Sequence, residues 1–230
     1  MNISGMNKLT LLDYPGHLAC IIFTQGCNFK CPFCHNSDLI KLTNQAASIQ
    51  EDELFAYLEQ RKNVLDGLVI SGGEPLLQPK IKDLIKKVKQ LGLKVKLDTN
   101  GTNCQLLKEL MDEKLIDYVA MDIKADEKTY TKVAGCEKNN FDSIKTAIDL
   151  LAKSGIDYEF RTTIVKEYHD EKQLENICTL IGQTGKYYLQ NFVHSDGVAQ
   201  TGLHGFTNLE LKELATNLNK KFPNVKVRGI

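Results

Sequence analysis

Three cysteines lie close together near the start of this 230-residue chain. Cys27, Cys31 and Cys34 belong to the segment GCNFKCPFCHN, with the spacing C-x3-C-x2-C. Thiolates are preferred ligands of iron–sulfur clusters and of zinc. A structural zinc site usually closes with four ligands, often from two C-x2-C pairs, and no second pair occurs here. Three thiolates on a four-iron cluster would leave one iron open, where a ligand could bind and receive an electron.

A zinc site completed by His35 or by a distant cysteine is the alternative, and it would make the chain a metal-binding interaction module without catalysis. The total of seven cysteines is odd and forms a poor disulfide framework. A reducing compartment and a metal site explain the pattern better. We expect the scattered cysteines to be small buried side chains; they are Cys20, Cys104, Cys136 and Cys178.

Further residues that could bind a ligand follow apolar segments along the chain. Three groups of them occur in the motifs SGGEP, LDTNG and MDIKA. An arginine interrupts the β-branched segment EFRTTIV, and a histidine follows the apolar residues FV in LQNFVHSDG. Glycines allow close approach of a ligand to the backbone, and carboxylates accept charge-assisted hydrogen bonds. These candidates are Gly72, Gly73, Glu74, Asp98, Thr99, Asn100, Asp122, Lys124, Arg161 and His194.

The elements that position these residues alternate between strand and helix. Short apolar runs predict strands, and apolar residues at helical spacing predict helices between them. A capping-box pattern, Ser48 with Glu51, opens the first predicted helix, and Gly92 is expected to end the second. The predicted strands are 18–24, 68–71, 93–99, 116–123, 157–165 and 186–193, with a final apolar stretch at 225–228; the later helices are 104–114, 141–154, 170–182 and 207–221.

About six strand–helix units predict an α/β fold with a parallel sheet and right-handed crossovers. Either a doubly wound sheet or an incomplete barrel would satisfy this pattern, and in both the ligands gather at the carboxyl ends of the strands. We expect one domain over residues 1–230, with the cysteine loop at 26–36 after the first predicted strand.

The composition excludes some classes of partner. Lysine plus arginine equals aspartate plus glutamate at 29 each, so no global charge favours nucleic acid. No run approaches the roughly 18 apolar residues of a membrane span. We therefore expect a cytoplasmic protein without a nucleic-acid or membrane partner.

The cysteine spacing, with the aromatic Phe33 before the last cysteine, resembles the signature of the radical S-adenosylmethionine superfamily. The resemblance implies a partial (β/α)6 barrel and a [4Fe–4S] cluster held by Cys27, Cys31 and Cys34. It also implies that the open iron chelates the methionine part of S-adenosylmethionine. One electron then cleaves this cofactor to methionine and a 5′-deoxyadenosyl radical. The protein binds the cofactor, orients it and shields it from solvent.

The same resemblance implies roles for the other candidates. Phe33 would pack by the adenine and Gly72 to Glu74 would bind the methionine amine, while Asp98, Asn100, Asp122 and Lys124 would contact the ribose and carboxylate. Asp98, Thr99 and Asp122 would be side-chain ligands of a monovalent cation. Arg161 and His194 would also contact the cofactor. Simpler alternatives remain: a core aromatic for Phe33, turn chemistry for Asp98 and Asn100, an ion pair for Arg161, and a surface position for His194.

Three features resemble the activases of glycyl radical enzymes. His35 and Asn36 complete the motif CHN, and only 36 cysteine-free residues separate Cys34 from Ser71, too few for a ferredoxin-like insertion. The segment LTLLDYPGHLACIIFTQGCNFKCPFCHN resembles the anaerobic ribonucleoside-triphosphate reductase activating proteins, and the likeness extends to the terminal VRG.

The implied reaction takes a hydrogen atom from a backbone glycine of a partner glycyl radical enzyme. A flavodoxin or ferredoxin-like donor would supply electrons, and the lysine run from Lys80 to Lys89 is either a solvated face or its docking surface. Two alternatives are an activase of a pyruvate formate-lyase type enzyme and a small-molecule enzyme such as a 7-carboxy-7-deazaguanine synthase.

Overall fold

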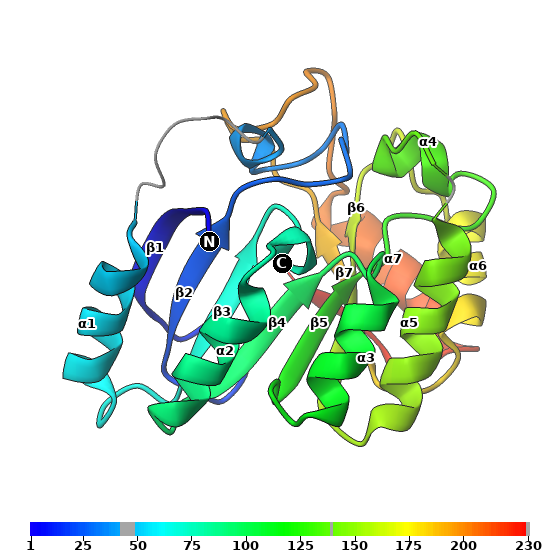
Figure 1. Cartoon of the computed structure of the whole chain (residues 1–230). Helices are drawn as coiled ribbons and strands as arrows, with labels where there is room; N and C mark the ends of the chain where they lie inside the picture. Colours follow the sequence, from blue (N-terminus) through cyan, green and yellow to red (C-terminus); the bar gives the residue numbers. More distant parts are fainter. Residues whose placement is uncertain (42–48, 139, 229–230) are drawn as a thin grey trace. The chain divides into compact units, whose positions relative to one another are not determined.

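The computed structural model describes residues 1–41, 49–138 and 140–228 (Figure 1). The chain forms two compact units. The first unit contains Met1–Asn28, Asp38–Thr99 and Asn103–Ala120. The second contains Phe29–Ser37, Asn100–Thr102 and Met121–Ile230. The boundary passes through the cysteine loop, since Cys27 belongs to the first unit and Cys31 and Cys34 to the second. That the whole chain acts as one domain stays a prediction.

The first unit is built on four strands that are hydrogen-bonded in chain order. They are β1 (Ile3–Thr10), β2 (Ala19–Thr24), β3 (Gly67–Gly72) and β4 (Lys94–Thr99). β1 runs antiparallel to β2, whereas β2, β3 and β4 are parallel. The helices are α1 (Glu51–Arg61), α2 (Ile81–Gln90) and α3 (Cys104–Asp112), with single 3-10 turns at η1 (Ser37–Leu39) and η2 (Pro75–Leu77).

Apolar spacing explains how these elements pack. The four apolar side chains of α2 recur at helical spacing and are all buried, as the sequence predicts. Gly92 follows the C-cap Leu91 with a φ of 81°, a left-handed conformation that glycine adopts without strain. The buried runs of β2 and β3 pair in register, with Cys20 opposite Leu68 and Ile22 opposite Ile70. Parallel strands of this kind end together, which brings the residues after them to one edge.

The second unit continues the alternation of strand and helix. β5 (Tyr118–Asp122) begins in the first unit and ends in the second. It is followed by α4 (Tyr130–Ala134), α5 (Phe141–Ser154), β6 (Asp157–Ile164), α6 (Glu171–Ile181), β7 (Lys186–Asn191), α7 (Asn208–Asn219) and β8 (Val225–Arg228). β6, β7 and β8 are parallel neighbours, with Phe160 opposite Tyr187 and Leu189 opposite Val227.

The predicted strand–helix alternation is confirmed, and the sequence analysis missed the antiparallel strand β1, the one-turn helix α4 and the single 3-10 turns η1 and η2. The capping-box prediction differs from the structure, because α1 begins at Glu51 behind an N-cap at Gln50, which makes no side-chain cap bond. Ser48 itself lies outside the described residues. None of the described helices combines the length and apolar character required to cross a lipid bilayer.

Candidate functional site

The turn after β3 packs directly against the start of the cysteine loop. The backbone N–H of Gly73 donates to the Thr24 carbonyl at 2.8 Å, and that of Glu74 donates to the Gly26 carbonyl at 2.8 Å. A Cβ on Gly73 would lie 2.2 Å from the Gly26 oxygen, and a Cβ on Gly72 would lie 2.3 Å from the Thr24 nitrogen. Glycines are therefore required here by close backbone packing next to Cys27, a reason that differs from the predicted approach of a ligand.

Glu74 is buried, and its carboxylate is oriented by two neutral donors. Its Oε1 accepts hydrogen bonds from the Leu76 N–H at 3.1 Å and from the Thr99 hydroxyl at 2.7 Å. Thr99, predicted as a cation ligand, thus supports Glu74 in this structure. A carboxylate held rigidly in a buried place is suited to receive a positively charged group of a ligand.

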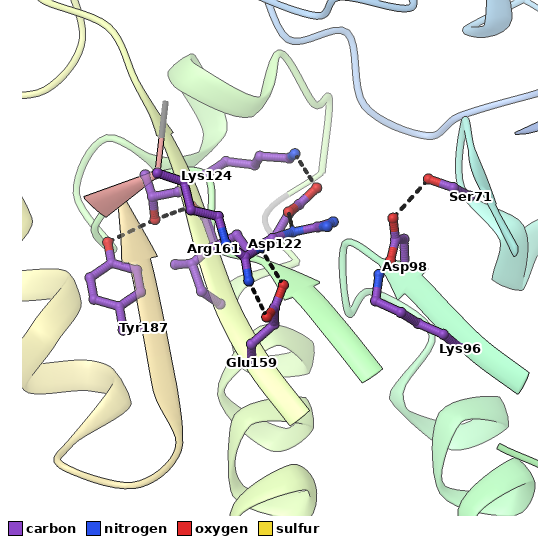
Figure 2. Close-up of polar contacts among 11 residues, drawn as sticks. Ser71, Lys96, Asp98, Asp122, Lys124, Glu159, Arg161 and Tyr187 are labelled. Carbon is purple, nitrogen blue, oxygen red and sulfur yellow. Dashed lines mark hydrogen bonds and ion pairs between the residues drawn. The ribbon is translucent and has the colours of Figure 1, made fainter. Parts of the chain in front are cut away.

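Asp98 forms an ion pair that the sequence analysis missed. Its Oδ1 contacts the ammonium of Lys96, whose side chain is almost fully buried, and its Oδ2 accepts from the Ser71 hydroxyl at 2.9 Å (Figure 2). The Lys96 ammonium also lies 5.9 Å from the centre of the Tyr118 ring. Because Lys96 and Asp98 are two residues apart on β4, their side chains leave the strand on the same face.

Asp122, at the end of β5, lies between two cationic side chains of the second unit (Figure 2). Its Oδ1 contacts Arg161 Nε at 2.8 Å, and its Oδ2 contacts Lys124 Nζ at 3.1 Å. Burial alone would raise the pKa of Asp122, but the charges of Arg161 and Lys124 outweigh it and hold that pKa below its usual range. The prediction that Lys124 lies on the same side as Asp122 is confirmed.

Arg161 therefore makes the ion pair that the sequence analysis kept as its structural alternative. A second pair in the same unit was not anticipated, since Glu159 of β6 is buried and binds Arg228 of β8 through two contacts of 2.8 and 2.7 Å. The guanidinium of Arg228 also stacks 3.6 Å from the centre of the Tyr188 ring. Bidentate pairing of this kind is the strong form of a charged hydrogen bond.

Cys31 is nearly buried and contacts the helix that the sequence analysis missed. Its thiol donates to the carbonyl of Ala134, the last residue of α4, at 3.5 Å, and the same carbonyl accepts from the Lys30 N–H at 3.0 Å. The Cys34 N–H donates to the Cys31 carbonyl at 3.1 Å. In the first unit, the Cys27 N–H donates to the Ile40 carbonyl at 3.1 Å. The loop is thus held by backbone contacts on both sides of the unit boundary.

Phe33 is buried beside His169, a second residue that the sequence analysis missed. The ring of Phe33 lies 6.0 Å from those of Tyr168 and His169. His169 Nδ1 accepts from the Val165 N–H at 3.1 Å, so Nε2 carries the proton and donates to the Lys124 carbonyl at 2.9 Å. Burial lowers the pKa of His169, which keeps the ring neutral. Packing alone accounts for Phe33 as a core aromatic, and its role beside adenine stays a prediction.

The remaining candidates show more ordinary surroundings. Asn100 Oδ1 accepts from the N–H and the hydroxyl of Thr102, at 3.0 and 2.7 Å, which is the turn chemistry named as its alternative. His35 Nε2 donates to the Val193 carbonyl at 2.7 Å. His194 is exposed after β7 and makes no hydrogen bond or ion pair with the described residues.

The donor chemistry of the cysteine loop fits an iron–sulfur cluster. Three thiols within eight residues supply sulfur alone, and four-iron clusters are held by thiolates. Across the described ranges, no three histidine, cysteine, aspartate or glutamate side chains surround one metal position. His35, one of the residues that could complete the zinc alternative, contacts the Val193 carbonyl through Nε2.

The basic run on α2 is largely neutralised within the first unit. Lys82 and Lys86 contact Glu113 at 2.6 and 3.4 Å, and Lys89 contacts Asp117 at 2.7 Å. Exposed ion pairs of this kind add little stability, but they remove most of the net positive charge. The docking of an electron donor on this face stays a prediction.

Comparison with known proteins assigns the family. The model described as "Radical SAM superfamily" matches residues 21–181. The chain belongs to the radical SAM superfamily. It is 34% identical to "Putative glycyl-radical enzyme activating enzyme MJ1227" of Methanocaldococcus jannaschii, over 99% of this chain and 96% of that protein. It is 32% identical to the pyruvate formate-lyase-activating enzyme of Clostridium pasteurianum, over 77% of this chain and 74% of that protein.

The fold has a solved counterpart. The crystal structure of Streptococcus suis SuiB bound to S-adenosylmethionine superposes with a TM-score of 0.70 at 17% identity, over 88% of this chain and 48% of that one. The predicted α/β fold, a partial (β/α)6 barrel of the radical SAM type, is thus confirmed. This member of the family is an enzyme of the glycyl-radical activating group, and its cofactors are a [4Fe–4S] cluster and S-adenosylmethionine.

Proposed function

We propose that this enzyme takes a hydrogen atom from a backbone glycine of an anaerobic ribonucleoside-triphosphate reductase and leaves a stored glycyl radical there. The observation that carries the proposal is the cysteine loop with its flanking sequence, which resembles the activating proteins of that reductase from Leu9 to Asn36. When bound, the reduced cluster and S-adenosylmethionine together supply a 5′-deoxyadenosyl radical that abstracts the hydrogen.

In this proposal Cys27, Cys31 and Cys34 bind the cluster and leave one iron to the cofactor. Glu74 accepts the ammonium of the methionine part, because its buried carboxylate is already aligned by Leu76 and Thr99. The turn that carries Glu74 is fixed to the carbonyl of Gly26, next to Cys27, so cluster and amine sites are linked through one backbone contact.

Within each unit, paired charges offer preformed contacts for a polar group of S-adenosylmethionine. Asp98 is held by Lys96 and Ser71, and it can accept from a ribose hydroxyl without reorganising. Lys124 and Arg161 share the carboxylate of Asp122, and we assign Lys124 to the carboxylate of the cofactor. A monovalent cation at Asp98 and Thr99, or at Asp122, would compete with the cationic side chain already on each aspartate.

The chain needs no general acid or base for this reaction, because the hydrogen leaves the glycine as an atom, proton and electron together, and not as a proton. Its residues must instead exclude water and oxygen from the radical. Glycine is a suitable target because it has no side chain to hinder approach of the radical.

A second candidate target is a pyruvate formate-lyase type enzyme. The 32% identity to the activating enzyme of Clostridium pasteurianum favours it. An electron donor of the flavodoxin or ferredoxin type belongs to the proposal for either target.

The test mixes the reduced, cluster-loaded enzyme with S-adenosylmethionine and one candidate partner at a time. Electron paramagnetic resonance is expected to show the doublet of a glycyl radical with the ribonucleotide reductase. A doublet only with the pyruvate formate-lyase type enzyme would select the second target, and none with any glycyl radical enzyme would contradict both.

Cys31→Ala is expected to abolish the doublet. It should also reduce the iron bound per chain from about four atoms to a small remaining fraction. Cys178→Ala is the matched control, because Cys178 is also a buried cysteine of the second unit outside any disulfide but lies on α6. It should retain the iron and the doublet. A doublet that survives in Cys31→Ala would contradict the assigned ligand.

A further inference from the structure

Lys96 is a buried cation to which the proposed reaction assigns no role of its own. Its side chain is 2% exposed, and its ammonium contacts Oδ1 of Asp98, two residues further along β4. Lysines are almost always exposed, because removal of an ammonium from water is costly unless the group is paired. A buried lysine at the strand end that carries a candidate cofactor contact therefore calls for a physical reason.

The surroundings of the Lys96 ammonium hold it in one place. The ammonium lies 5.9 Å from the centre of the Tyr118 ring, and this ring packs in a T-shaped arrangement on Tyr14, with centroids 5.9 Å apart. An aromatic face attracts a cation at this range. Both tyrosines belong to one buried apolar cluster, in the same unit as Lys96 and Asp98. The ammonium thus lies between an aromatic ring and a carboxylate.

The carboxylate of Asp98 is held by contacts on both of its oxygens. Oδ1 contacts Lys96, and Oδ2 accepts from the Ser71 hydroxyl at 2.9 Å (Figure 2). The Asp98 side chain is 13% exposed, so water screens its charge only in part. A carboxylate in such a place requires a positive partner, and Lys96 supplies one from within the chain.

The cation site implied by the family resemblance does not fit these contacts. Side chains of successive strand residues point to opposite faces, so Asp98 and Thr99 leave β4 on different sides. Accordingly, the Thr99 hydroxyl donates to Glu74 Oε1 at 2.7 Å, whereas Asp98 contacts Lys96. An ammonium group has the charge of a potassium ion and is close to it in size. Lys96 therefore already occupies the place on Asp98 that a monovalent cation would take.

We propose that the ammonium of Lys96 replaces a monovalent cation in this enzyme, as a counter-charge that belongs to the chain. Lys96 is then a positioning residue, which balances the charge of Asp98 and keeps its carboxylate in one orientation for a ribose hydroxyl of the cofactor. The inference deepens the proposed function, on which that role of Asp98 rests. It follows that the wild-type enzyme needs no added sodium or potassium.

Lys96→Met tests the replacement, because methionine keeps the apolar stem and ends one atom before the ammonium nitrogen. Thermal unfolding of the full cluster-free chain is followed in choline, potassium and ammonium chloride at equal ionic strength, so that general screening is the same. In choline chloride we expect the unfolding midpoint to lie roughly 10 °C below that of the wild type, because a buried carboxylate has lost its partner.

Potassium and ammonium should each restore at least half of that difference, and the effect should saturate with concentration, because either ion can bind Asp98 where the lysine ammonium was. The wild type should have the same midpoint in all three salts. A double variant, Lys96→Met with Asp98→Asn, removes both charges. It should be more stable in choline chloride than Lys96→Met alone and should not respond to potassium.

Lys89→Met is the matched control. Lys89 also pairs with an aspartate of the first unit, Asp117, which accepts in addition from the Val95 N–H at 2.7 Å. The Lys89 and Asp117 side chains are 29% and 31% exposed, so water can solvate the carboxylate when the lysine is removed. This variant should lose little stability and should behave alike in the three salts.

Three results would overturn the inference. A wild-type chain that potassium stabilises relative to choline would show that it still takes up a cation. A Lys96→Met chain with one midpoint in all three salts, or one that stays unfolded in all of them, would mean that Lys96 serves packing alone. A potassium response that persists in the double variant would place the cation away from Asp98. Absence of a glycyl radical with every partner would instead overturn the proposed function and leave the replacement of the cation intact.

Discussion

At the scale of single residues, the polar side chains that follow the strands are paired with one another before any ligand binds. Asp122 holds Arg161 and Lys124, and Asp98 holds Lys96. Burying one of these charges alone would cost several kcal/mol, whereas a paired set can stay buried in a fixed geometry. Such pairs provide charged groups that need not rearrange when a polar cofactor arrives.

His169 makes the stability of the folded chain depend on pH. Its folded-state pKa is lowered by burial, so the unfolded chain binds a proton more readily than the folded one. The contribution of His169 to stability is complete above the unfolded pKa of about 6.5 and is lost as the pH falls below it, by up to about 1.4 kcal/mol per pH unit. Unfolding of the cluster-free chain in urea at pH 7.5 and 5.5 measures this loss.

His169→Gln should be less stable at the higher pH and should lose less stability between the two. The control is His194→Gln, because His194 is exposed, and it should behave as the wild type. Equal losses of stability in His169→Gln and the wild type would show that this ring does not carry the effect.

Sequence reasoning reached the residues whose motif is local and missed those whose partner is distant. Cys27 to Cys34 and Gly72 to Glu74 are contiguous patterns, and they could be singled out directly. Lys96 and His169 look like ordinary residues of a strand and a loop, and only the fold shows that they are buried against Asp98 and Phe33. Burial of a charged group is a property of the tertiary structure and leaves no mark on the local sequence.

At the scale of elements, short segments hold the cysteine loop in place, and two of them contact it next to its first two cysteines. The turn after β3 binds its beginning, through Gly73 and Glu74, and α4 binds its middle, through Ala134. Both are compact, and their residues approach the loop with backbone atoms. A loop supported in this way presents its thiols with little conformational freedom to lose on cluster binding.

Gly73→Ala tests the support by the β3 turn. A Cβ there would meet the Gly26 carbonyl at 2.2 Å, a backbone atom that cannot move without displacing Cys27. We expect a loss of stability of about 1–3 kcal/mol, typical of overpacking, and poorer retention of iron. Thermal unfolding and iron content check both effects.

Gly5→Ala is the control for that variant. It lies in β1 of the same unit, and its added Cβ would be 3.8 Å from Phe23, an ordinary contact. Gly5→Ala should change neither the stability nor the iron content. Full iron content and stability in Gly73→Ala would show that the turn does not position the loop.

The long periodic elements were predictable, and the short or irregular ones were not. The helix α5 and the strand β8 have the predicted bounds, because the first buries a regular apolar stripe and the second alternates valine with a basic residue, the period of a strand. β1 is half-exposed and contains Gly5, so it lacks the apolar run of a parallel strand. α4 spans a single turn, too short for helical periodicity to show.

At the scale of the whole molecule, membership of the family explains why a chain with balanced charge carries three clustered thiols. Its fold is shared with proteins of little sequence identity, and a 17% identical counterpart still superposes over 88% of this chain. What distinguishes this chain is the set of residues at the strand ends, since function is determined by sites and one fold can host many of them. The choice of partner therefore has to be tested with the whole enzyme.

The most direct test of the account is electron paramagnetic resonance of the reduced enzyme, purified without oxygen, before and after addition of S-adenosylmethionine. Three cysteine ligands leave one iron of a four-iron cluster for the cofactor, so the account predicts a [4Fe–4S] signal whose shape changes when the cofactor binds. A cluster signal that is identical with and without S-adenosylmethionine, or a colourless zinc protein, would contradict it.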